Sequence, residues 1–130
     1  ICSYQKKFKL IKTVSEYEGN YTYPVSCIIN DGHGKMYVST FGNGLFSFEN
    51  DKIVHYGLKE GLKSESIYSL FIDTKQNLWL ATWQGGAIKF DTKKFAIYSK
   101  KDGLADSKVY GIAEDRRGNL LFATSQGGLS

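Results

Sequence analysis

Residues 73–86 have the sequence Asp73-Thr74-Lys75-Gln76-Asn77-Leu78-Trp79-Leu80-Ala81-Thr82-Trp83-Gln84-Gly85-Gly86. Closely similar sequences occur once before and once after this stretch. The interval is 42 residues, because Asp73 lies midway between Asp31 and Asp115 (73 − 31 and 115 − 73). Further sets at this interval are Val25/Ile67/Val109, Ile28/Leu70/Ile112, Thr40/Thr82/Thr124 and Gly44/Gly86/Gly128. A period of roughly 40 to 45 residues indicates a repeat architecture such as a propeller or a solenoid.

Each copy contains four short apolar runs separated by turns. In the middle copy the runs cover residues 67–72, 78–82, 87–90 and 95–98, and they are rich in β-branched and aromatic residues. Runs of this length are typical of strands and too short for helices. Four short strands per repeat are the pattern of one propeller blade. We therefore expect an all-β protein made of β-propeller blades, each with four antiparallel strands.

The register divides the chain into blades. Residues 1–24 are expected to be the end of a preceding blade, with its fourth strand near residues 8–14, followed by a linker. Residues 25–66 and 67–108 are expected to form whole blades, and residues 109–130 an incomplete one. Closed propellers need roughly four to eight blades. We expect about three blades' worth of a larger propeller, whose partners are the remaining blades of the parent protein or other chains.

Composition and charge disfavour two classes of partner. The 130 residues are 42% hydrophobic and carry a formal net charge of +4. No apolar run approaches the roughly 18 residues of a membrane-spanning helix, so we expect no membrane contact by this segment. The lysines are spread over turns, which is typical of a solvated surface that keeps strand edges from pairing. We therefore expect no nucleic-acid partner.

The sequence offers no set of residues suited to catalysis. His33 and His55 stand at unrelated positions of the repeat, which favours surface residues over an acid/base or metal pair. Asp31 begins a four-residue turn that ends in glycine, as expected for turn capping rather than for a calcium loop. Gly85-Gly86 joins two strands without a helix N-terminus, which disfavours a phosphate cradle. We expect no catalytic residue, no metal and no cofactor.

The candidate binding residues lie at one end of the blades. Because strands alternate in direction, the fourth-to-first and second-to-third connections emerge on the same face. Aromatic and amide side chains occupy this face at positions that differ between copies, and such groups can stack on sugar rings and bond hydroxyls. The candidate ligand-binding residues are Phe41, Tyr68, Trp83, Gln84, Tyr110 and Gln126. The alternative is that Tyr68 and Tyr110 only fill space between blades.

The stretch from Asp73 to Gly86, together with the linker Gly103-Leu104-Ala105-Asp106-Ser107, resembles the two-component regulator propeller repeat. That pattern places Asp before a turn glycine, then Asn-Leu-Trp, a Thr and a glycine pair, and later an Asp-Gly-Leu-x-Ser linker. The departures from it are Tyr37 and Leu121 for Trp, Gln76 for the turn glycine, Asn43 for the first glycine of the pair, and Ala87 for Leu. Each departure keeps the apolar or turn character of its site.

The resemblance implies a role in signalling. Such repeats build the periplasmic sensor region of bacterial hybrid histidine kinases, many of which sense oligosaccharides. It therefore implies a non-catalytic, extracytoplasmic or periplasmic sensing propeller with an oligosaccharide ligand. The alternative is a structural or protein-docking scaffold, secretion-associated or on a diguanylate cyclase, without a small-molecule ligand. A propeller enzyme of the streptogramin-lyase kind is weaker, because its acid/base histidines have no counterpart here.

Overall fold

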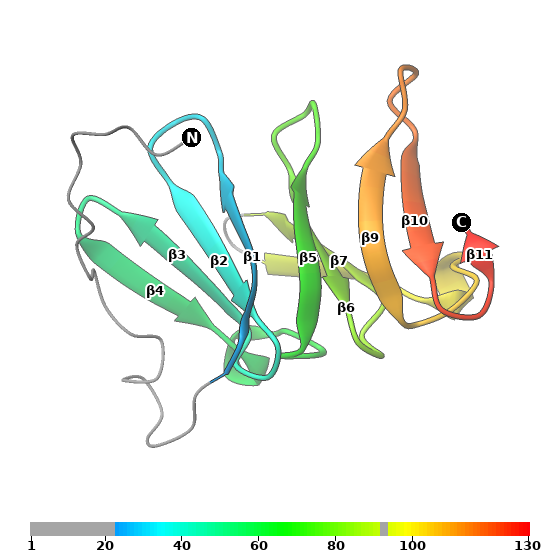
Figure 1. Cartoon of the computed structure of the whole chain (residues 1–130), viewed down its shortest axis with the longest axis horizontal. Coiled ribbons are helices and arrows are strands. Elements are labelled where there is room, and N and C mark those ends of the chain that lie inside the picture. Colours follow the sequence, from blue (N-terminus) through cyan, green and yellow to red (C-terminus); the bar gives the residue numbers. More distant parts are fainter. Residues whose placement is uncertain (1–22, 92–93) are drawn as a thin grey trace.

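The computed structural model describes residues 23–91 and 94–130, which form three antiparallel sheets (Figure 1). The first sheet contains β1 (Val25–Asn30), β2 (Met36–Thr40), β3 (Leu45–Glu49) and β4 (Lys52–Tyr56). The second contains β5 (Ile67–Ile72), β6 (Leu78–Thr82), β7 (Ala87–Asp91) and β8 (Lys94–Tyr98), and the third β9 (Val109–Glu114), β10 (Leu120–Thr124) and β11 (Gly128–Leu129). Two 3₁₀ turns, η2 (Leu58–Glu60) and η3 (Lys100–Asp102), lead from one sheet to the next. The all-β propeller-blade fold is confirmed, while the strand expected near residues 8–14 lies outside the described residues.

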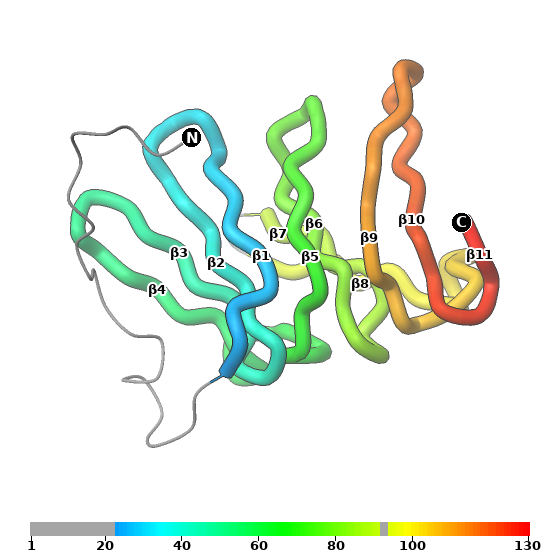
Figure 2. The backbone as a smooth tube through the Cα atoms, in the orientation of Figure 1, coloured from blue at the N-terminus to red at the C-terminus, as the bar shows by residue number. Residues whose placement is uncertain are grey.

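The first strands of the three sheets stand in a row, with β1 against β5 and β5 against β9 (Figures 1 and 2). The later strands of each sheet extend away from this row, as in blades stacked around an axis. Leu45, Ile67, Leu80 and Ile88 are fully buried in the core between the first two sheets. Burying such a side chain stabilises the fold by about 1.5 to 3 kcal/mol, so the packing of one blade on the next is the main apolar contribution.

The face of β1 that points away from β5 is not covered by described residues. Val25 is 50% exposed and Ile28 is 62% exposed, although their counterparts in β5, Ile67 and Leu70, are only 0% and 7% exposed. The first sheet covers these positions in the second sheet, whereas no described residues cover the corresponding face of the first sheet. Exposed apolar faces of this kind mark interaction surfaces.

The third sheet presents a matching uncovered face. Leu129 of β11 is 67% exposed, whereas its counterparts Leu45 and Ala87 are fully buried by the following blade. The first and third sheets therefore carry complementary surfaces, one of the kind that a preceding blade covers and the other of the kind that a following blade covers.

We expect the isolated chain to associate at concentrations on the order of tens of micromolar, because both end faces are apolar. Replacing Ile28 by Lys is expected to shift sedimentation toward the monomer with little loss of stability, since this side chain is already exposed. Leu70→Lys is the matched change at a buried position and is expected to unfold the chain. An Ile28→Lys chain that associates as strongly as the unmodified one would contradict the assignment of this face.

Asp73 organises the turn between β5 and β6. Its Oδ1 accepts the backbone N–H groups of Lys75 (3.0 Å) and Asn77 (2.8 Å), and its Oδ2 accepts the indole N–H of Trp79 (2.8 Å). Burial by itself raises the pKa of Asp73, but the bonds from Trp79, Asn77 and Lys75 outweigh it and hold the pKa below its ordinary value. These charge-assisted bonds fix both the turn and the Trp79 ring.

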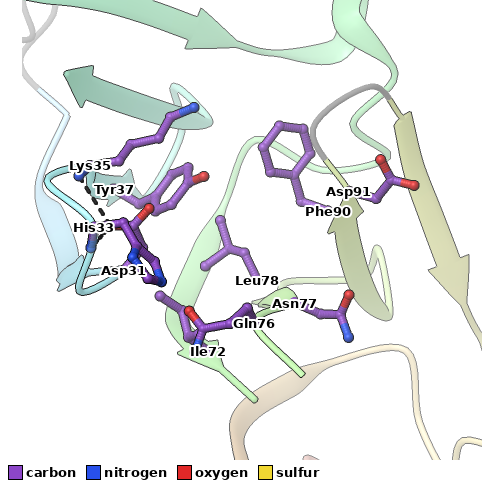
Figure 3. Close-up of a pocket in the computed structure, with 10 residues that line it drawn as sticks. All are labelled: Asp31, His33, Lys35, Tyr37, Ile72, Gln76, Asn77, Leu78, Phe90 and Asp91. Atoms are coloured by element: carbon purple, nitrogen blue, oxygen red, sulfur yellow. Dashed lines mark hydrogen bonds between the residues drawn. The ribbon is translucent and has the colours of Figure 1, made fainter. Parts of the chain in front are cut away.

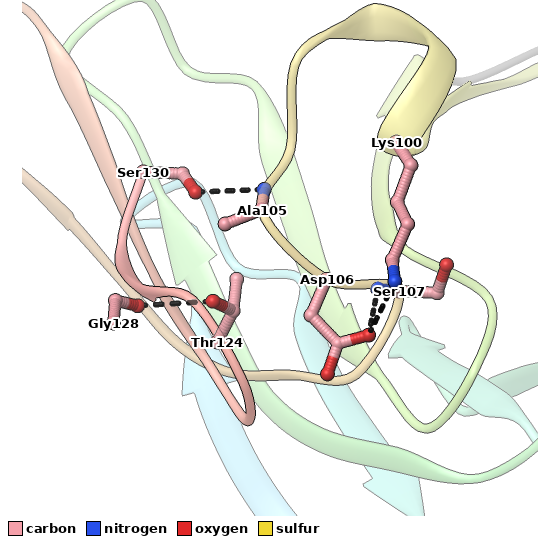
Figure 4. A network of polar contacts seen from close by, with 7 residues as sticks. All are labelled: Lys100, Ala105, Asp106, Ser107, Thr124, Gly128 and Ser130. Atoms are coloured by element: carbon pink, nitrogen blue, oxygen red, sulfur yellow. Dashed lines mark hydrogen bonds and ion pairs between the residues drawn. The ribbon is translucent and has the colours of Figure 1, made fainter.

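The linker after η3 is tied to the third sheet by polar contacts (Figure 4). The backbone N–H of Ala105 donates to Ser130 Oγ (2.9 Å), and Asp106 Oδ1 accepts the N–H of Ser107 (2.8 Å) and lies 3.5 Å from Lys100 Nζ. Burial raises the pKa of Asp106, yet the bonds from Ser107 and Lys100 lower it overall. This linker leads directly into β9, so its anchoring sets the position of the third sheet's first strand.

Candidate ligand-binding face

Each sheet has a β-bulge at the same position of its first strand. The pairing register shifts between Val25 and Cys27 in β1 and recurs at the equivalent positions of β5 and β9. The extra residues are Ser26, Tyr68 and Tyr110. A bulge changes the direction of the side chain that it carries. The bulges therefore set the side-chain directions of the residues at the inner end of each blade.

The turns between second and third strands bring a second set of side chains to the same end. In the second sheet, the hydroxyl of Thr82 donates to the carbonyl of Gly86 (2.7 Å), which closes the β6–β7 turn. The N–H of Trp83 then donates to the carbonyl of Ser66 (2.9 Å), in the linker that enters β5. The N–H of Phe41 makes the equivalent bond to Pro24 (2.9 Å). Backbone bonding thus holds these two rings beside the starts of β1 and β5.

Four of the six candidate side chains meet in one place, which we call the aromatic cluster (Phe41, Tyr68, Trp83 and Tyr110). The centroid of Tyr68 lies 4.6 Å from that of Tyr110, 5.1 Å from that of Phe41 and 5.9 Å from that of Trp83. Phe41 and Trp83 are 6.4 Å apart in an edge-to-face arrangement. The cluster spans all three sheets, and Phe41 and Tyr110 remain exposed at 37% and 43%.

A cation, the side chain of Lys108, lies against the aromatic cluster. Lys108 Nζ lies 4.2 Å from the centroid of the Trp83 ring, a cation–π contact, and no carboxylate of the described residues forms an ion pair with it. The pKa of Tyr68 is raised, first by burial and then by the neighbouring Tyr110 phenol. The Tyr68 phenol therefore remains a neutral hydroxyl donor at physiological pH. The surface combines apolar rings, hydroxyl donors and one positive charge.

The two candidate glutamines lie apart from this cluster. Gln84 and Gln126 are exposed in the β6–β7 and β10–β11 turns, outside the ring-to-ring contacts that join the four aromatic side chains. Gln84 adopts a left-handed backbone with φ of 61°. They lie at the rim of the same end of the blades rather than among the rings.

Lys108 is the residue of this face that sequence reasoning missed. It occupies the repeat position of Ser66 in the preceding copy, so the fold itself does not require a lysine there. A change of chemical type at one repeat position was the available signal. The direction of the side chain, over Trp83, follows from packing between two copies and is not visible in the sequence.

The histidines do not form a catalytic pair in the structure. His33 is exposed in the β1–β2 turn. His55, expected at the surface, is instead half-buried, stacks on Phe46 with centroids 4.5 Å apart, and bonds through Nε2 to the carbonyl of Asn43 (2.8 Å). That expectation was wrong because His55 lies directly opposite Phe46 in the β3–β4 pairing, where the two rings stack. His55 has a structural role there.

Residues 23–91 and 94–130 contain no group of three or more His, Cys, Asp and Glu side chains placed to hold a metal ion. No helix among them has the length and apolar character needed to cross a bilayer.

The family model described as "Two component regulator propeller" matches residues 61–84 and 103–126. Each match runs from the linker glycine, through the first and second strands, to the turn that carries the candidate residues. The resemblance seen in the sequence is thereby confirmed over these two stretches. Among curated proteins, none matches this sequence.

Solved structures with a similar fold come from several proteins. The extracellular domain of a hybrid two-component system from B. thetaiotaomicron superposes with a TM-score of 0.69 at 24% identity, covering 82% of this chain and 16% of that one. PorZ, a surface component of the type-IX secretion system of Porphyromonas gingivalis, gives 0.62 at 14% identity, covering 81% and 17%. Virginiamycin B lyase from Staphylococcus aureus gives 0.63 at 19% identity, covering 82% and 40%. The chain thus spans about a sixth of the first two proteins, and the likeness establishes the propeller fold.

Proposed function

We propose that this chain, which carries two-component regulator propeller repeats, is part of the extracytoplasmic ligand-sensing propeller of a two-component signalling protein of the hybrid histidine kinase type. Its ligand is an oligosaccharide, and the segment itself is non-catalytic. The similarity to the extracellular domain of a hybrid two-component system supports the setting. The aromatic cluster supports an oligosaccharide as the ligand.

The observation that carries the proposal is the convergence of four rings from three blades at repeat positions that vary. Ser26 and Ser125 occupy the bulge and turn positions in other copies, so the fold accepts a small residue at both. Aromatic rings there have no general structural necessity. Rings that expose apolar faces beside hydroxyl donors are the groups that bind sugars by stacking and hydrogen bonding.

Replacing Trp83 by Ala is expected to weaken oligosaccharide binding by about 1 to 3 kcal/mol, roughly 5- to 150-fold. Tyr110→Ala is expected to act in the same direction, because Tyr110 is the most exposed ring of the cluster. The measurement is calorimetric titration of the whole protein that contains this chain with a panel of oligosaccharides. Trp83 is half-buried, so its removal should lower stability by less than about 2 kcal/mol.

Tyr98→Ala is the matched control, since Tyr98 is 38% exposed but packs on Trp79, outside the cluster. It should leave affinity unchanged. If Trp83→Ala instead lowers stability by about 3 kcal/mol or more, as a core deletion does, the ring is a packing element between blades and the site is wrongly assigned. A folded protein that binds no oligosaccharide of the panel would favour the docking-scaffold alternative.

A further inference from the structure

A second feature lies between the first two sheets, where the β1–β2 and β5–β6 turns approach the end of β7. A cavity of about 320 Å³ opens there, and we call it the interblade cavity (Figure 3). Its lining contains Tyr37, Ile72, Gln76, Leu78 and Phe90, with polar residues of the β1–β2 turn at the rim. Apolar side chains from both sheets thus line the cavity together with polar and charged ones.

The next interface along the chain shows why this space stays open. Between the second and third sheets, Thr74 donates through both its N–H (2.8 Å) and its hydroxyl (2.6 Å) to the carboxylate of Glu114. The corresponding residues one repeat earlier are Gly32 and Ile72, which cannot form this bridge. The first interface therefore lacks the polar closure of the second, and the cavity occupies the unbridged position.

Tyr37 directs an unpartnered polar group into the cavity. Its side chain is only 6% exposed, yet its hydroxyl makes no hydrogen bond to any of the described residues. Figure 3 shows the hydroxyl directed from β2 toward Phe90 on the far wall. Its counterpart Trp79 donates its indole N–H to Asp73, so the repeat normally satisfies the polar atom at this position. Among the described residues, the fully buried side-chain polar atom without a partner is Asn43 Nδ2, so the Tyr37 hydroxyl is in contact with the open space of the cavity and is available to a bound molecule.

Gln76 is the second unusual residue of the lining. It adopts a left-handed backbone with φ of 65°, at the repeat position where Gly34 and Gly118 have φ of 96° and 83°. A residue with a Cβ is strained in this conformation, and such strain is characteristic of functional positions. Its side-chain amide makes no hydrogen bond within the described chain, and in Figure 3 it extends toward the β1–β2 turn.

We infer that the interblade cavity is a binding site for a small, neutral, hydroxyl-bearing ring molecule of the size of a single sugar residue. The phenol of Tyr37 and the amide of Gln76 offer neutral donors and acceptors, and the rings of Tyr37 and Phe90 offer an apolar wall. Charge does not favour an anion, because Lys35 shares the lining with Asp31 and lies 4.0 Å from the carboxylate of Glu49. This site lies at the opposite end of the blades from the aromatic cluster and does not depend on the function proposed for that cluster.

The test uses the whole protein that contains this chain, in a Trp83→Ala background that removes a ring of the aromatic cluster. The probes are methyl glucoside, methyl galactoside and N-acetylglucosamine, with glucuronate as the anionic comparison, each titrated by calorimetry. At least one neutral probe should bind in the range of roughly 0.1 to 10 mM, more tightly than glucuronate. Tyr37→Phe and Gln76→Gly should each reduce that affinity about tenfold, because each removes one hydrogen-bonding group.

Neither variant should lower thermal stability, because Tyr37→Phe removes an unpaired hydroxyl and Gln76→Gly removes a strained residue. Tyr56→Phe is the matched control, since Tyr56 packs on Phe90 but does not line the cavity, and it should bind the probe as the unmodified protein does. Three results would overturn the inference: no binding of any neutral probe, tighter binding of glucuronate, or unchanged affinity in both cavity variants.

Discussion

Replacing Gly86 by Ala is expected to destabilise the chain by about 4 kcal/mol, whereas the same change at Gly128 should cost only about 1 kcal/mol. Both glycines have left-handed backbones, with φ of 75° and 70°. The two substitutions therefore pay the same conformational cost. They differ in what the added methyl group meets.

At Gly86 the new Cβ would be forced against the backbone carbonyl oxygen of Tyr98, at a separation that real Cβ atoms do not show. A carbonyl of the neighbouring β8 connection cannot move aside as a flexible side chain can, so the turn or the strand must shift. At Gly128 the Cβ meets no described atom within 4 Å. Urea unfolding of both variants provides the comparison. Equal losses of stability would contradict the packing of the β6–β7 turn on the end of the fourth strand.

Asp73→Ala is expected to lower the free energy of unfolding by about 3 kcal/mol, because a buried carboxylate that satisfies four N–H donors is lost. Those donors include the indole of Trp79, which no water can easily reach once the ring is buried. The control is Asp115→Ala. Asp115 caps the equivalent turn through Asn119 but is not bonded to a ring, and we expect a loss of about 1 kcal/mol there.

Asp73 also makes the stability of the folded chain depend on pH. The folded-state pKa of Asp73 lies below its ordinary value, so the unfolded chain binds the proton more readily. The stabilisation is complete above the unfolded pKa of about 3.9 and is lost as the pH falls through the folded pKa. Unfolding midpoints measured from pH 6 down to about pH 2 should fall more steeply for the unmodified chain than for Asp73→Asn. Parallel curves would show that Asp73 is not held as a carboxylate by Trp79 and the turn.

Much of this architecture follows from the 42-residue register. The spacing of Ile67, Leu78, Ala87 and Phe95 placed the four strands of the second sheet, because short apolar runs between turns have few other folds available. The candidate face could be derived as well. Strand alternation places the variable aromatic residues at one end, and four of the six candidate side chains do meet there.

Other features could not be derived in this way. Tyr37 and Gln76 depart from the repeat pattern but keep the apolar or turn character of their positions. In the structure Tyr37 is buried in β2 and Gln76 lies in the β5–β6 turn. The repeat pattern does not show which groups, if any, hydrogen-bond the Tyr37 hydroxyl and the Gln76 amide. The partners of these polar atoms depend on the neighbouring blade. Thr74 and Glu114 bridge the interface between the second and third sheets, whereas Gly32 and Ile72 hold the same positions between the first and second sheets. Residues that preserve the fold in their own blade can therefore still create a site between blades.

The central claim is that the aromatic cluster contacts an oligosaccharide, and the two tryptophans of this chain allow it to be measured directly. Trp83 belongs to the cluster, while Trp79 is buried by Tyr98 and Phe122 and bonded to Asp73. We propose labelling the whole protein with 5-fluorotryptophan and assigning the two ¹⁹F resonances through Trp79→Phe and Trp83→Phe. When an oligosaccharide binds, we expect the Trp83 resonance to shift and the Trp79 resonance to stay in place. Saturating binding that leaves the Trp83 resonance in place would contradict this claim.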